Sequence, residues 1–174
     1  MPTVDTWLHE VLPLLRRFQE TFEARHGHPP GDNRVEPRTA GRTGDHDLPP
    51  QLGEFYEQVD AVWLEDLHHG YFVHPLDHVV DAEATGLPTR VPEVSAGRFV
   101  TFGSTGGGDL YAVSCFGGPV YRLPAARVVD NVYTSAGLPP SMVAEDFSAF
   151  LGLITAELRR ALAPRQPPPR PDGA

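Results

Sequence analysis

A glycine-rich turn interrupts a run of strand-forming residues near the middle of the chain, and it constrains the fold more than any other feature of the sequence. Residues 102–113 read FGSTGGGDLYAV. Consecutive glycines reach backbone conformations with positive φ that other residues adopt only at a cost, so the chain can reverse tightly or approach another backbone closely. We therefore predict a structural turn between two strands, made of Gly106, Gly107, Gly108 and Asp109, in which Asp109 hydrogen-bonds its own local backbone.

Apolar residues elsewhere follow helix and strand periods. Their spacing predicts an N-terminal helix that ends at Gly27 and is kinked or restarted near Leu12, because Pro13 removes a backbone donor. A short helix is expected from Pro49 or Pro50, and a C-terminal helix after a cap at Ser141 or Asp146. Strand patterns occupy residues 62–64, 71–73, 98–102, 109–115, 119–123 and 128–133, with a hairpin turn at Gly117 and Gly118.

These elements predict an α+β fold, with a mainly antiparallel sheet and helices packed against one of its faces. The chain has 174 residues, which fits a single domain over residues 1–163. Residues 27–47 are rich in Gly, Pro, Asp and Arg and predict a long flexible loop. Residues 164–174 contain five prolines and predict an extended, disordered tail.

The negative charge of the chain is concentrated in one segment. Residues 45–88 contain ten carboxylates and no Arg or Lys, whereas the net charge of the whole chain is -9. The ten are Asp45, Asp47, Glu54, Glu57, Asp60, Glu65, Asp66, Asp77, Asp81 and Glu83. Phosphate contacts need cationic side chains, so we expect no nucleic-acid partner and favour a basic protein partner. The alternative is a solvated face that only keeps the protein soluble.

Aromatic residues lie close to these acids in the sequence. Exposed aromatic side chains beside charges are typical interface anchors. We assign Trp63 and Phe72 preferentially to core packing, while Tyr71 fits either role. The predicted partner-binding residues are therefore Glu65, Asp66, Tyr71, Asp77 and Asp81.

The residues that could support catalysis form no recognisable motif. Five histidines (His46, His68, His69, His74 and His78) share the acidic segment, but Pro75 disturbs the spacing that would present His74 and His78 to one metal ion. The glycine turn lacks the Lys of a phosphate loop, and Ser104 lacks a nucleophile elbow. We expect no cofactor, no metal and no enzymatic activity.

The sequence also predicts the cellular compartment, from its cysteine content and from the length of its apolar runs. The single cysteine, Cys115, cannot form an internal disulfide, which fits a reducing cytoplasm. No apolar run approaches the roughly 18 residues of a membrane helix, so we expect no membrane partner. The oligomeric state is left open.

Several phrases together resemble the SUKH superfamily. They are Leu48-Pro49 before the short helix, the segment 102–113, Pro119-Val120-Tyr121, and residues 147–151 (FSAFL). The resemblance spans residues 48–162, although Val59-Asp60-Ala61-Val62 replaces the Asn-Gly or Asp-Gly pair of many members. It implies a SUKH-like fold and a bacterial immunity protein that binds and neutralises a toxin, such as a nuclease. The alternatives are a regulator or adaptor with another partner, like the fungal cell-wall-synthesis member, and a small metal-dependent hydrolase.

Overall fold

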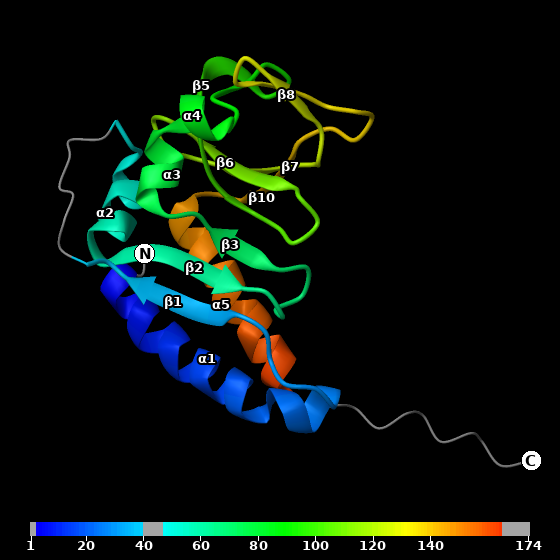
Figure 1. The fold of residues 1–174 in the computed structure, drawn as a ribbon. Coiled ribbons are helices and arrows are strands. Elements are labelled where there is room, and N and C mark those ends of the chain that lie inside the picture. The colour runs from blue at the N-terminus through cyan, green and yellow to red at the C-terminus, as the bar shows by residue number, and fades with distance from the viewer. Residues whose placement is uncertain (1–2, 40–46, 165–174) are drawn as a thin grey trace, which may run out of the picture.

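Ten strands form one curled sheet in the computed structural model, which describes residues 3–39 and 47–164 (Figure 1). They are β1 (Asn33–Pro37), β2 (Val59–Leu64), β3 (Tyr71–Val73), β4 (Arg90–Val91), β5 (Ser95–Ser104), β6 (Leu110–Ser114), β7 (Val120–Leu123), β8 (Arg127–Val129), β9 (Val132–Thr134) and β10 (Ser141–Ala144). The strand order is β1-β2-β3-β5-β4-β9-β8, with β6 also on β5, β7 on β6 and β10 on β7. Every pairing is antiparallel except that of β4 with β9.

Five helices accompany the sheet: α1 (Val4–His26), α2 (Pro50–Gln58), α3 (Leu76–Val80), α4 (Ala82–Thr85) and α5 (Phe147–Leu162). The prediction of an α+β fold with a mainly antiparallel sheet is confirmed. Helices α1, α2 and α5 bury one face of the sheet in the main core. Trp7 of α1 anchors this layer, since its indole Nε1 donates to the main-chain oxygen of Leu151 at 3.1 Å.

Helix α1 begins and ends with strong capping interactions. Thr3 accepts from the main-chain N–H of Thr6, and Gly27, at φ 80°, donates to the main-chain oxygen of Glu23. The predicted restart near Leu12 is wrong, because α1 is one continuous helix through Pro13. Pro13 lies on the exposed side, where water can solvate the carbonyl that loses its partner.

The opposite face of the sheet is covered over only part of its area. Strands β4, β8 and β9 fold over β5, β6 and β7 and enclose a second, smaller core around Val91, Phe99, Leu123 and Tyr133. They do not extend over β1, β2 and β3. Helix α3 buries Leu76 and Val79 in the main core together with α1, α2 and α5, so these helices share one core as expected, and Figure 1 shows α3 beside α2.

Strand β1 corrects the prediction of a loop over residues 27–47. It pairs with β2 in antiparallel register, Arg34 opposite Trp63 and Val35 opposite Val62. Asn33 fixes its start: the Asn33 amide donates to Asp66 at 2.6 Å, and its oxygen accepts from the Asp66 main-chain N–H at 3.2 Å. The loop composition hid this short strand because its stability comes from these distant contacts. Residues 40–46 of the predicted loop lie outside the described residues.

The glycine turn joins β5 to β6 as predicted, but only one of its glycines has positive φ. Gly108 has φ 89°, and its N–H donates to the Thr105 oxygen at 3.2 Å. Gly106 serves a different purpose, because its N–H donates to the main-chain oxygen of His69 and ties the turn to the β2–β3 connection. Gly107 is not among the glycines with positive φ.

Asp109 closes the turn toward β7 instead of bonding its own local backbone, which corrects that prediction. Its carboxylate pairs with Arg122 and accepts from the Ala125 N–H at 2.9 Å. Burial alone would raise the pKa of Asp109, but these donors outweigh burial and lower it. The turn is therefore structural, and Asp109 is its anchor.

Three further outcomes concern the C-terminal half. The strand predicted over residues 128–133 is a hairpin of β8 and β9, turned by Asp130 and Asn131 at φ 49° and 57°. Asp146 caps α5, whereas Ser141 begins β10. The predicted tail, apart from Pro164, lies outside the described residues.

Within the part of the chain that the structure describes, no helix has the length and apolarity to cross a bilayer.

Candidate functional site

The uncovered face of the sheet carries a cross-strand row of four side chains. Arg34 lies opposite Trp63, Trp63 opposite Phe72, and Phe72 opposite Ser104, so the row crosses β1, β2, β3 and β5. Side chains alternate along a strand, and the neighbours Val62, Leu64, Tyr71 and Val73 point into the main core. We call the face that carries the row the outer face.

A cleft of about 550 Å³ opens on the outer face. It is lined by Trp63, Glu65, Phe72, His74, Pro75, His78, Ser104, Thr105 and Gly106. The Trp63 and Phe72 rings meet edge to face with centroids 5.8 Å apart and form an aromatic wall. Its volume lies within the range of about 300–1,000 Å³ that is typical of ligand pockets.

Two histidines form the other wall, where β3 leads through Pro75 into α3. The His74 and His78 rings lie edge to face, with centroids 5.0 Å apart. His74 Nε2 is 2.9 Å from Ser104 Oγ. Burial, and secondarily the neighbouring His78, lowers the pKa of His74 to about 4, so its imidazole is neutral at pH 7.

Two orphaned polar atoms mark this cleft. Among the described residues, the buried side-chain nitrogens without a hydrogen-bond partner are Trp63 Nε1 and His74 Nδ1, and both residues line the cleft. A buried donor or acceptor without a partner costs about 1–3 kcal/mol, so native structures avoid it outside functional sites and hydrated pockets. The coincidence of both atoms at one cleft makes it the leading candidate for a binding site.

The contact between His74 and Ser104 has the geometry of a base beside a hydroxyl, but its surroundings are poor for acyl transfer. A catalytic histidine is oriented by an acid at its other ring nitrogen, and His74 Nδ1 has no partner among the described residues. The main-chain N–H groups of Thr105 and Gly106 donate to the oxygens of Asp109 and His69. They are therefore not available to stabilise an oxyanion.

The structure places the three aromatic residues differently from the roles chosen from the sequence. Tyr71 is only 4% exposed and stacks on Tyr111 in the core, so it cannot be the predicted partner anchor. Trp63 and Phe72, assigned preferentially to the core, are half-buried in the cleft wall. The alternation of strand residues carried the signal that could have found this, because Val62 and Leu64 must point the opposite way from Trp63.

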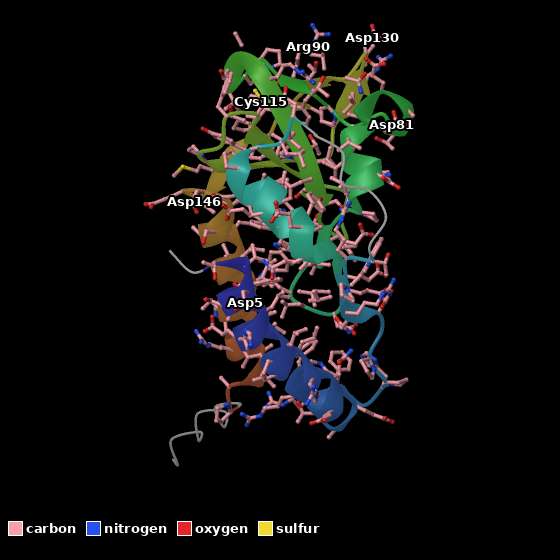
Figure 2. All side chains as sticks on the ribbon, turned by 90° about the vertical axis from the view of Figure 1, so that its left-hand side faces the viewer. Asp5, Asp81, Arg90, Cys115, Asp130 and Asp146 are labelled. Carbon is pink, nitrogen blue, oxygen red and sulfur yellow. The ribbon has the colours of Figure 1, made fainter. Side chains whose placement is uncertain are left out.

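The four predicted acidic residues divide into two groups. Glu65 lines the cleft and Asp77 lies in the first turn of α3, and both are exposed. Asp81 at the end of α3 is also exposed, and Figure 2 shows it across the molecule from Asp146 at the start of α5. Asp66 is half-buried and accepts hydrogen bonds from the N–H of Gly31 at 2.7 Å and from Asn33. Glu65 also supports this segment, since its Oε2 accepts from the Asp32 N–H at 2.9 Å. Glu65 is exposed and lines the cleft, so it keeps its assignment, whereas the half-buried Asp66 is not assigned to partner contact.

The remaining acids of the segment do not gather in one patch. Glu54 and Glu57 lie in α2, on the layer that covers the other face of the sheet, and Asp45 lies outside the described residues. No cluster of three or more metal-ligating side chains is found in residues 3–39 and 47–164, and His46 lies outside that range. Among the described residues, Glu65 is thus the one acid of the segment that lines the cleft.

Comparison with known proteins adds no further constraint. No family model, no curated protein and no solved structure matches this chain. The resemblance to the SUKH superfamily stays a prediction that depends on the sequence phrases given above. The role of the cleft is inferred from its own residues.

Proposed function

We propose that the chain is a non-enzymatic protein-binding domain whose outer face receives a basic protein partner, and that it acts as an immunity protein that neutralises a toxin. The observation that carries the proposal is the outer-face cleft, with an aromatic wall beside the exposed carboxylate of Glu65. Aromatic side chains in a recess that water can leave are the usual energetic centre of a protein interface.

Charge supports a basic partner. Among the described residues, those that line the cleft include one carboxylate, Glu65, and no arginine. Asp77 and Asp81 add exposed negative charge on α3, which follows His74 of the cleft through Pro75. Complementary charge accelerates encounter by steering, and nucleases in particular carry positive surfaces for phosphate.

The immunity role itself comes from the SUKH resemblance, and the regulator with a partner other than a toxin shares the same binding surface. The small metal-dependent hydrolase is less well supported, since residues 3–39 and 47–164 contain no cluster of three or more metal-ligating side chains. The two protein-binding roles differ in what the partner does, so one experiment can separate them.

The test is capture of the partner from native cells with the tagged chain, in parallel with two variants. Glu65→Lys combined with Phe72→Ala alters the cleft, whereas Glu54→Lys makes the same charge change on α2. A basic protein that is retained by the parent and by Glu54→Lys, but lost with the cleft variant, supports the binding face. Retention by all three variants would place the partner elsewhere on the molecule.

The captured protein then decides the role. Expressed alone it should arrest growth, and co-expression of the parent chain should restore growth while the cleft variant does not. A captured protein that is harmless when expressed alone would contradict the immunity role and leave the regulator. Thermal melting of the cleft variant confirms that its loss of binding is not loss of folding.

A further inference from the structure

We propose that the outer-face cleft receives an arginine side chain of the partner, stacked on its aromatic wall and paired with Glu65. The inference rests on the proposed function, because it names the chemical group that the partner inserts.

The walls of the cleft favour a flat cation. Planar guanidinium groups stack on aromatic rings, and the Trp63 and Phe72 rings border the cleft together. Glu65 lies two residues after Trp63, just past the end of β2, and both residues line the cleft. A carboxylate beside an aromatic wall is the combination that holds a guanidinium by stacking and by charge-assisted hydrogen bonds.

The chain already contains an example of this arrangement on the same face. The guanidinium of Arg34 lies over the Trp63 ring, 5.4 Å from its centroid. It is held there by ion pairs with Asp32 and Glu36, the second at 2.7 Å. Among the described residues Arg34 is outside the cleft lining, which contains the two rings and Glu65 but neither Arg nor Lys.

Other groups in the cleft tolerate a cation and disfavour an anion. His74 stays neutral at pH 7 because burial lowers its pKa to about 4, so it does not repel a guanidinium. Ser104 Oγ and the Glu65 carboxylate are hydrogen-bond acceptors for its N–H groups. An anionic ligand would face Glu65, with the N–H groups of Thr105 and Gly106 already occupied.

Arginine fits these features better than lysine. A lysine ammonium is a compact, strongly hydrated charge that stacks less well on rings and cannot make a forked contact with a carboxylate. A lysine of the partner could still pair with Glu65, but its ammonium group would not stack on the Trp63 and Phe72 rings as a planar guanidinium does.

The test is an NMR titration of the full chain with three peptides: acetyl-Gly-Arg-Gly-amide, the same peptide with Lys, and the same peptide with citrulline, the uncharged isostere of arginine. The indole N–H signal of Trp63 reports on the cleft. The indole of Trp7 is an internal control, because it is buried and bonded to the Leu151 oxygen. We expect a saturable shift of the Trp63 signal with the arginine peptide only, at millimolar concentration.

Two variants complete the test. Glu65→Gln keeps an oxygen that can accept from the Asp32 N–H but removes the charge, and should weaken binding of the arginine peptide at least fivefold. Glu54→Gln removes the same charge from α2 and should leave binding unchanged.

Several results would overturn the inference: no shift of the Trp63 signal, equal binding of the citrulline or lysine peptide, or equal weakening by Glu54→Gln. These failures are distinguishable from failure of the proposed function. If the arginine peptide does not bind but the captured partner is still lost with the cleft variant, the binding face stands and only the arginine assignment falls. If the peptide binds but the partner is retained by every variant, the proposed function falls.

Discussion

Replacing Gly103 with alanine should destabilise the fold strongly, because this glycine lets two central strands approach. An added Cβ would lie closer than 3.0 Å to the main-chain oxygen of Phe72, a separation that real Cβ atoms essentially never show. The contacting atom belongs to the backbone of β3, which is paired with β5 through Val73 opposite Gly103. Relief of the overlap therefore requires the two strands to separate.

The magnitude follows from the contacts that separation would damage. Overpacking of a tight site costs about 1–3 kcal/mol, and each weakened ladder hydrogen bond costs about 1 kcal/mol more. We expect Gly103→Ala to lower the free energy of unfolding by about 3 kcal/mol. For a domain of this size, that loss corresponds to a fall in Tm of about 6–12 °C.

The assay is urea denaturation with a matched control, Gly107→Ala. The Cβ added at Gly107 would meet Thr105 Oγ1 at 3.7 Å, an ordinary contact, and its φ is not positive. This control should change the free energy of unfolding by less than about 0.5 kcal/mol. A Gly103→Ala protein as stable as Gly107→Ala would refute the close-approach argument, and with it the strand geometry that places Phe72 beside Ser104.

Three further predictions concern polar contacts. Arg25→Lys should lose about 1–2 kcal/mol of stability in thermal melting. The Arg25 guanidinium donates to the main-chain oxygens of Ala161, Leu162 and Ala163 at the end of α5, and a lysine ammonium cannot span all three. Stability equal to that of the parent would contradict this prediction. Because the pKa of His74 is lowered to about 4, the unfolded state binds more protons than the folded state between pH 6.5 and 4. The free energy of unfolding of the parent should therefore fall by up to about 3 kcal/mol as pH drops through that interval, while that of His74→Gln should not. Parallel pH profiles of the two proteins would contradict this. Asp109 has a lowered pKa, so the Tm difference between the parent and Asp109→Asn should be present at pH 7 and shrink progressively as pH falls below about 4. A Tm difference that does not shrink at all below about pH 4 would contradict an ionic contribution.

The sequence predicted elements whose signals are local. Trp7, Val11, Leu15, Phe18 and Phe22 recur at helical spacing, and α1 buries all of them. The two glycines at 117 and 118 both have positive φ and turn β6 into β7 as predicted. Local steric rules decide such features, so one sequence suffices to find them.

Elements that depend on distant contacts were missed. Strand β1 has a loop-like composition, and it is held by Asp66, by pairing with β2 and by Gln19, which donates to the Asn33 oxygen. Pro13 predicted a break that the packing of α1 on the sheet and α5 overrides. In both cases tertiary contacts outweigh local preference.

The candidate site was predicted only in part. Glu65 was chosen for its charge and does line the cleft, but the contact of His74 with Ser104 joins residues 30 positions apart and has no sequence motif. Tyr71 was included among the partner-binding residues and Phe72 was assigned preferentially to the core, whereas Tyr71 is buried and Phe72 lines the cleft. Strict use of the strand period would have placed Phe72 beside Trp63 on the outer face.

The most direct measurement of the account is the association rate of the captured partner as a function of salt. Between 0.05 and 0.5 M salt the screening length falls from about 14 to about 4 Å, so an encounter steered by charge should slow at least tenfold while dissociation changes less. The variant Glu65→Lys, Asp77→Lys, Asp81→Lys, which spares the structural Asp66, should associate slowly at both salt concentrations. An association rate that does not change with salt concentration, or a triple variant that binds as fast as the parent, would contradict the proposal that a basic partner binds the outer face.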